Sequence, residues 1–129
     1  MKKLIMLALM IFGVQSYTAS AHHAFAQEFS VDLPVDLNGI VTRVELINPH
    51  SWIHIAVTNA EGVEEGWMIE GGSPNSLFRQ GITKDSIPIG AELDVFGYQA
   101  RDRTLKAVGR DISFADGTPL FFRETRVPE

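Results

Sequence analysis

Four histidines carry the chemistry available to this chain of 129 residues. His22 and His23 are adjacent near the beginning, and His50 and His54 are four residues apart further along. Imidazole nitrogen is a common ligand for copper and zinc at neutral pH. Because the sequence contains no cysteine, thiolate metal sites, thiol catalysis and disulfides are excluded. A transition-metal site in this chain would therefore be built on histidine nitrogen.

The residues before His22 predict that it becomes an N-terminus. Two lysines (2–3) precede a short apolar run (4–14) and the small-residue triplet "ASA" (19–21), which is the order of an export signal and its peptidase site. Cleavage after this triplet removes residues 1–21, and the apolar run is too short to remain as a membrane span. We expect a protein exported to a bacterial periplasm, with no stable membrane anchor after cleavage.

A free N-terminal His22 predicts a copper site. Its α-amine and its ring Nδ1 can chelate one ion together, and the amine, whose pKa is about 8, loses its proton at little cost near neutral pH. One further imidazole completes a T-shaped set of three nitrogens, the histidine brace, which suits Cu(II). His50 or His54 could supply that imidazole, and His23 could instead offer its ring together with the intervening amide.

Chain geometry limits the choice between the two later histidines. His50 and His54 lie on the same face of a predicted strand, but residues four apart in a straight strand are separated by about 13 Å. The segment 22–34 spans at most roughly 40 Å, so His22 can reach either of them. We favour His50, because the turn made by "INPH" leaves room for an incoming N-terminus.

A second interpretation needs no metal. Two tryptophans and the "EGGSPN" turn would form a face that binds a peptide, a small ligand or another periplasmic protein. The residues of this face are Trp52, Trp67, Gly71, Gly72 and Asn75. Under this interpretation the paired histidines are an ordinary chain end, and Met68 only packs.

Charge and motifs exclude several function classes. Loss of Lys2 and Lys3 with the signal leaves 9 basic against 16 acidic residues, a net charge of about −7 with neutral histidine. An acidic domain is not expected to bind nucleic acid or anionic membranes. No nucleophile-elbow or zinc-protease spacing is present. We therefore expect binding rather than catalysis, with a metal ion or small ligand as the partner.

The elements that position these residues are mostly strands. Period-two alternation places Ile53, Ile55 and Val57 on one face of a strand over 52–58. Further strands are predicted over 35–46, with Ile40, Val44 and Leu46 on its apolar face, and over 67–70, 92–99, 105–114 and 120–123.

One short helix is predicted in "GGSPNSLFRQG". Ser73 caps it, Pro74 starts it, and Leu77 and Phe78 face inward. Three strands, a short helix and two strands are the order of an OB-fold, so we expect a mainly β, small five-stranded OB-like barrel with its helix between strands 3 and 4. The chain then divides into a signal peptide, a leader of the mature chain and the barrel domain, covering residues 1–21, 22–34 and 35–129.

Four stretches carry a resemblance to a known family. They are "AHHAF", "VTRVELINPHSWIHI", "EGGSPNSLFRQGITKDSI" and "GYQARD". Together they resemble a family of small exported bacterial proteins catalogued as a domain of unknown function, over nearly the whole mature chain. The strand order is also similar to that of periplasmic OB-fold proteins. The resemblance implies a periplasmic barrel-like domain and assigns it no activity.

Overall fold

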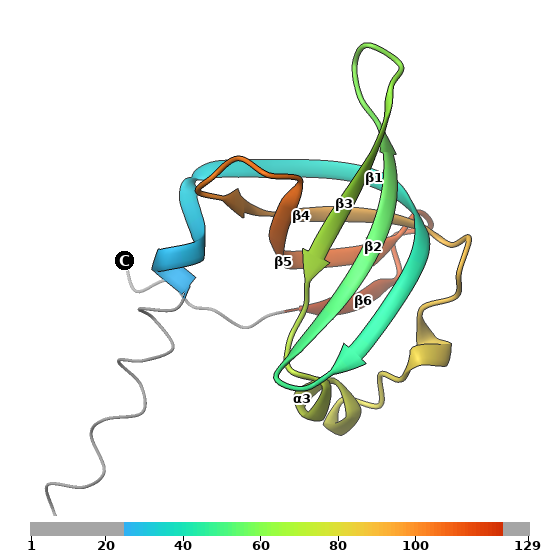
Figure 1. Cartoon of the computed structure of the whole chain (residues 1–129). Coiled ribbons are helices and arrows are strands. Elements are labelled where there is room, and N and C mark those ends of the chain that lie inside the picture. Colours follow the sequence, from blue (N-terminus) through green and yellow to red (C-terminus); the bar gives the residue numbers. More distant parts are fainter. Residues whose placement is uncertain (1–24, 123–129) are drawn as a thin grey trace, which may run out of the picture.

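The computed structural model describes residues 25–122, with side chains as far as residue 120. The predicted signal and both His22 and His23 lie outside this range. Six strands, one α-helix and one 3-10 helix follow a single helical turn at residues 25–28 (Figure 1). The elements are β1 (Phe29–Ile47), β2 (His50–Thr58), β3 (Glu64–Glu70), α3 (Pro74–Arg79), η1 (Lys84–Ser86), β4 (Glu92–Ala100), β5 (Lys106–Phe114) and β6 (Pro119–Phe122). No helix within this part of the chain has the length and apolar character to cross a membrane.

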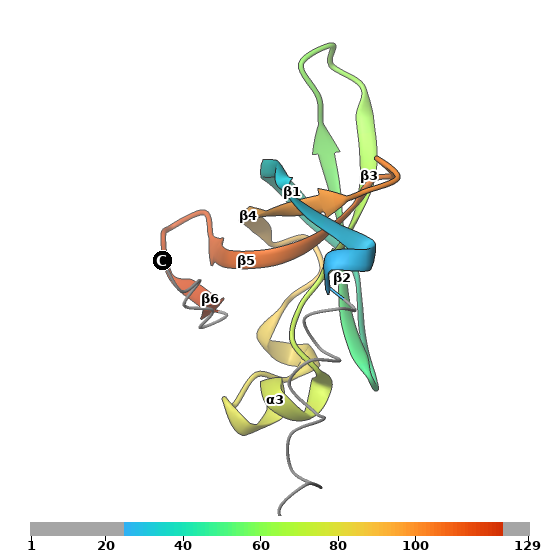
Figure 2. The ribbon, with the colours of Figure 1, turned by 90° about the vertical axis from the view of Figure 1, so that its left-hand side faces the viewer.

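The strands close into a barrel of OB topology. The long strand β1 pairs with β2 through its second half and with β4 through its first half, and both pairings are antiparallel. The sheet order is β3-β2-β1-β4-β5-β6, and a parallel pairing of β3 with β5 closes the ring. α3 lies between β3 and β4 in the chain and packs at one end of the barrel (Figure 2). The predicted fold class is confirmed, and β6 adds a short edge strand to the five of the barrel.

The core consists of the inward faces of these strands. Ile53 and Ile55 are each 1% exposed and Val57 is 7% exposed, as the alternation in β2 predicts. Ile69 of β3 and Leu93 of β4 are fully enclosed with them. The opposite face of β2, which carries its histidines, therefore points outward.

Strand β1 differs from the prediction in where it begins and in which of its residues face inward. It begins at Phe29 rather than at residue 35, and a register shift between Phe29 and Pro34 hides this extension from a period-two search. A second shift places Thr42 as an extra residue between paired neighbours. The inward positions are odd-numbered before this bulge and even-numbered after it, so Val41 and Val44 are both buried while Ile40 is 43% exposed. The predicted inward position of Ile40 is wrong for this reason.

Helix α3 begins as predicted and differs in one side chain. The Ser73 hydroxyl accepts a hydrogen bond from the Ser76 backbone N–H at 3.2 Å, and proline starts the helix. Leu77 is buried in the main core, but Phe78 is 52% exposed. A helix of six residues presents only a narrow inward face, so its inward positions do not include both neighbours.

Candidate functional site

The outward face of β2 carries three aromatic or imidazole side chains in alternation. His50, Trp52 and His54 share this face, while the residues between them point into the core. The register of the sheet places Glu45 of β1 and Glu70 of β3 on either side of Trp52. The outward face of β2 therefore has a carboxylate on each side of Trp52.

His50 is held by a buried carboxylate. Its Nδ1–H donates to Oε1 of Glu70 at 2.7 Å, and the Glu70 side chain is only 9% exposed. The imidazole itself is 53% exposed, and its ring centre lies 6.4 Å from that of Trp52. Because Nδ1 is occupied, Nε2 is the nitrogen that His50 offers to a ligand.

His54 has the same kind of partner in a different electrostatic setting. Its Nε2–H donates to Oε2 of Glu45 at 2.9 Å, and Arg43 forms an ion pair with the same carboxylate. The hydrogen bond from His54, and then the charge of Arg43, hold the pKa of Glu45 below its ordinary value. His54 is left with Nδ1, the nitrogen next to its own backbone.

Nearby cations distinguish the two histidines. Arg43 is the register partner of His54 on one side, and Met68 is its partner on the other. Met68 in turn pairs with Lys106, whose Nζ lies 5.6 Å from the centre of the Trp52 ring. Arg43 is therefore the cation directly beside His54, and its charge disfavours a metal ion there, whereas Lys106 lies over Trp52 between the two histidines.

His50 has no such neighbour on β1. Its register partner is Ile47, which is 70% exposed, and the charged group that it contacts is the carboxylate of Glu70. The negative charge of Glu70 favours a bound cation at the free Nε2. Of the two histidines, His54 has a cation as a register partner on β1 and His50 does not.

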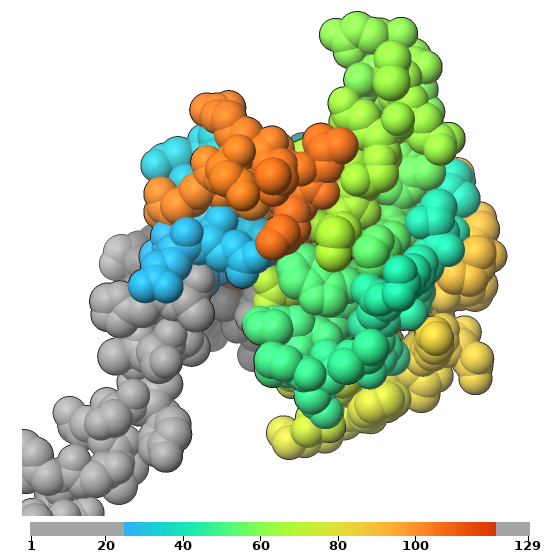
Figure 3. All heavy atoms as spheres, viewed as in Figure 1, coloured from blue at the N-terminus to red at the C-terminus, as the bar shows by residue number. Residues whose placement is uncertain are grey.

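The N-terminal segment of the described chain docks beside this face. Phe29, Ala100 and Val108 form a small buried cluster, and both Phe25 and Trp52 pack against it. In Figure 3 residues 25–28 (blue) and the β4–β5 turn (orange) lie beside the β2–β3 strands (green). Phe25 and Trp52 therefore contact one shared cluster.

The residues of the predicted metal-independent face are separated by the fold. Trp52 is on the outer face, whereas Trp67 is 6% exposed in the main core, so the two do not form one platform. Gly71 and Gly72 make a tight connection to β2, with the Ser51 hydroxyl donating to the Gly72 carbonyl at 2.5 Å. Asn75 is exposed on α3.

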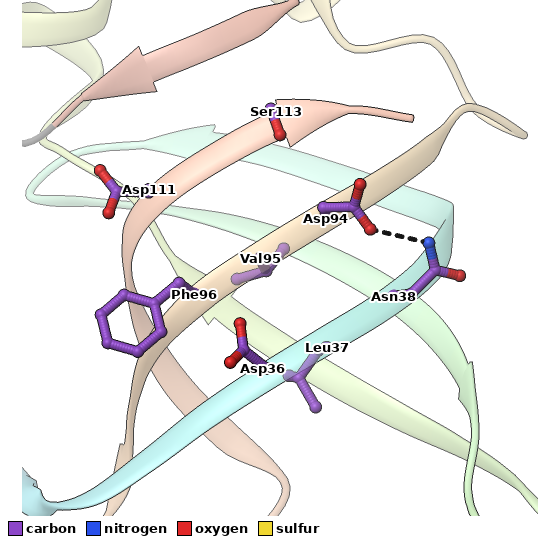
Figure 4. Close-up of a pocket in the computed structure, with 8 residues that line it drawn as sticks. All are labelled: Asp36, Leu37, Asn38, Asp94, Val95, Phe96, Asp111 and Ser113. Carbon is purple, nitrogen blue, oxygen red and sulfur yellow. Dashed lines mark hydrogen bonds between the residues drawn. The ribbon is translucent and has the colours of Figure 1, made fainter. Parts of the chain in front are cut away.

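A shallow hollow of about 330 Å³ lies on a different part of the barrel, over β1, β4 and β5 (Figure 4). Its lining consists of Asp36, Leu37, Asn38, Asp94, Val95, Phe96, Asp111 and Ser113. The Asn38 amide donates to Oδ1 of Asp94 at 2.9 Å and to Glu92 at the same distance. Across residues 25–122, here and at the β2 face, no three histidine or acidic side chains gather closely enough to hold a metal ion.

The two carboxylates are the site residues that sequence reasoning missed. Glu45 and Glu70 are 25 positions apart in the sequence and flank Trp52 only through the strand register. A weak signal was available, since Glu70 ends an apolar strand and stands directly before two glycines. A carboxylate in that place is costly to bury without a partner.

Comparison with known proteins gives a family and one similar solved structure. A family model described as "Family of unknown function (DUF6152)" matches residues 11–109. No curated protein matches the chain. Among solved structures, the N-terminal domain of the PriB protein from Thermoanaerobacter tencongensis, described as dimeric, has a TM-score of 0.45 and 22% identity. The similarity covers 65% of this chain and 97% of that domain.

Proposed function

Because the chain belongs to this family of unknown function, we propose a function from its own residues: it is a periplasmic Cu(II)-binding protein. The ligands are the α-amine and ring Nδ1 of His22, freed by removal of residues 1–21, and Nε2 of His50. The observation that carries the proposal is the hydrogen bond between His50 and the buried carboxylate of Glu70.

The His50–Glu70 pair has the arrangement of a metal-binding histidine. Such histidines usually donate their second ring N–H to a carboxylate, which fixes the tautomer and increases the basicity of the coordinating nitrogen. Glu70 occupies Nδ1 and leaves Nε2 facing outward. Among the described residues this supplies one nitrogen with a supporting carboxylate, so a complete site needs nitrogens from elsewhere.

The proposed ligands lie on a short arm before the described chain. His22 precedes Phe25 by three residues, which span at most about 10 Å when extended. Phe25 packs on the cluster that Trp52 also contacts, and Trp52 is the ring neighbour of His50. The proposal therefore requires these three residues to carry His22 from Phe25 to Nε2 of His50.

The location agrees with how OB-folds bind their ligands. Such barrels commonly use the face of strands 2 and 3 and the loops between strands 1 and 2 and between strands 4 and 5. His50 begins β2 directly after the first of these loops, and the turn at residues 101–105 is the second. The proposed copper site lies between them.

Copper titration of two forms of the protein tests the proposal. One form begins at His22, and the other carries a single extra methionine before it, which removes the free amine from the histidine chelate. We expect the first form to bind one Cu(II) tightly and the second to bind it at least about tenfold more weakly, since even loss of a supporting partner costs about 10- to 100-fold. Equal affinities would refute a site that uses the N-terminal amine.

A further inference from the structure

We propose that the hollow over β1, β4 and β5 is a docking site for an arginine side chain of a partner polypeptide. It lies on a different part of the barrel from the β2 face, and the proposed copper site uses none of its residues. Three observations support this ligand chemistry. They are an aromatic ring between two carboxylates, a lining that offers hydrogen-bond acceptors and no cation, and a guanidinium stacked on the neighbouring ring.

The register of the sheet places Phe96 of β4 between two carboxylates. Its partner on β1 is Asp36, and its partner on β5 is Asp111. Figure 4 shows the Phe96 ring near these two side chains, with Asp94 further along the same strand. The three aspartates are exposed, and Phe96 is half-buried. A cation beside this ring would be attracted both by the ring and by the two negative charges.

The other polar groups of the hollow are arranged to accept hydrogen bonds. The amide nitrogen of Asn38 donates both to Asp94 and to Glu92, which leaves its carbonyl oxygen for a ligand. The lining contains no lysine, arginine or histidine, and none of the ion pairs within residues 25–122 involves Asp36, Asp94 or Asp111. A matching ligand brings positive charge and several donors. The planar guanidinium of arginine brings five N–H groups and also stacks on aromatic rings.

The chain itself places a guanidinium on the next ring of this strand. Arg110 is the extra residue where the register of β4 and β5 shifts, and its guanidinium lies 5.4 Å from the centre of the Tyr98 ring and 5.6 Å from that of Phe25. The rings of Tyr98 and Phe96 are 5.7 Å apart. Among the described residues, Tyr98 has a stacked cation and Phe96 has none. Phe96 and its two carboxylates therefore offer the same kind of contact to a cation from another molecule.

The shape of the hollow favours a side chain over a free small molecule. Its volume of about 330 Å³ is at the low end for ligand sites, and pockets that hold free small ligands enclose most of the ligand surface. A polypeptide can add contacts around a shallow hollow, and Ile40, which is 43% exposed, lies beside Glu92 at one end. The net charge of −5 also attracts a basic partner at long range.

The test compares two peptides that differ in one charge. They are acetyl-Gly-Gly-Arg-Gly-Gly-amide and the same peptide with citrulline in place of arginine, which keeps the shape and removes the charge. NMR titration of isotope-labelled protein reports which backbone amides respond. We expect the arginine peptide to shift the amides of residues 36–38, 94–96 and 111–113 at low ionic strength, and added salt to weaken the binding. Equal shifts from both peptides, or shifts confined to other parts of the chain, would overturn the proposal.

Paired variants test the two parts of the hollow. Asp111→Asn removes one carboxylate and Phe96→Leu removes the ring, and each should weaken binding of the arginine peptide about two- to fivefold, as exposed ion pairs and exposed cation–π contacts do. Glu64→Gln on β3 and Phe78→Leu on α3 make the same kinds of change at exposed positions elsewhere and should leave the affinity unchanged. The amide spectra report whether each variant is folded, and Asp36→Asn replaces Phe96→Leu if that variant is not. Equal affinities of the hollow variants and the controls would contradict the assignment.

Ethylguanidinium distinguishes a polypeptide partner from a free cation. It presents the same charged group without a peptide backbone, so it should shift the same amides and bind more weakly than the arginine peptide. If ethylguanidinium binds as tightly as the peptide, the hollow is a site for a small cation, and the inferred polypeptide partner is wrong.

Discussion

Replacing Glu70 with glutamine removes the charge behind His50 while keeping the shape of the side chain. The carboxylate is 9% exposed and accepts the Nδ1–H of His50 at 2.7 Å. An ion bound at Nε2 would lie about 6 Å from this carboxylate, across the ring and one metal–nitrogen bond of about 2 Å. Glu70→Gln should therefore weaken copper binding without altering any ligand.

The size of the effect follows from Coulomb's law. A divalent ion about 6 Å from one negative charge gains roughly 1.4 kcal/mol in bulk water and roughly 5.5 kcal/mol at an effective dielectric constant of 20. The imidazole of His50 is 53% exposed, which favours the lower end of that range. We expect a loss of about 1.4–2.7 kcal/mol, or 10- to 100-fold in affinity, as observed for partners of metal-binding histidines.

Glu45→Gln is the matched control, because Glu45 holds His54 in the same way. Isothermal titration with Cu(II) on protein that begins at His22 measures both variants. We expect Glu45→Gln to change the affinity far less than Glu70→Gln does. A larger loss of Cu(II) affinity for Glu45→Gln would refute the inference that the charge of Glu70 supports a metal ion at His50. It would assign the third nitrogen to His54.

Two further predictions concern the barrel. A Cβ atom at Gly97 would lie 2.1 Å from the Val108 carbonyl oxygen, whereas one at Gly66 meets nothing within 4 Å. In urea unfolding, Gly97→Ala should lower the free energy of unfolding by about 3 kcal/mol, and Gly66→Ala should leave it unchanged or raise it by about 0.5 kcal/mol. Equal effects of the two substitutions would contradict the close approach of β4 and β5 at Gly97. Hydrogen bonds from Thr118 hold the pKa of Asp116 below its ordinary value of 3.8, so its contribution to stability is present above that pH and is lost as the pH falls through the lowered pKa. The stability difference between wild type and Asp116→Asn should therefore shrink in acid, and a difference that grows there would contradict the assignment.

Regular alternation made much of the fold predictable from sequence. The inward and outward faces of β2 follow from period two, and the place of α3 follows from Ser73 and Pro74. The bulge at Thr42 was not predictable, because it inserts one residue without a glycine or proline to mark it. The exposed positions of Ile40 and Phe78 are consequences of local geometry that composition does not record.

The candidate site was predictable only in part. His50 and His54 stand out by residue type, but the choice between them depends on Glu70 and Arg43, which come from other strands. Cross-strand neighbours are set by register, and register depends on the whole sheet. Docking of residues 25–28 on the β4–β5 turn is likewise a contact between segments about 75 residues apart.

Pulsed EPR of the Cu(II)-loaded protein beginning at His22 tests the proposed ligand set most directly. The remote nitrogen of each coordinated imidazole gives its own modulation, so the rings can be counted. We predict two coordinated imidazoles in the wild-type protein and one in His50→Ala, with the amine of His22 retained in both. Identical spectra from the two proteins would contradict a copper site shared by His22 and His50.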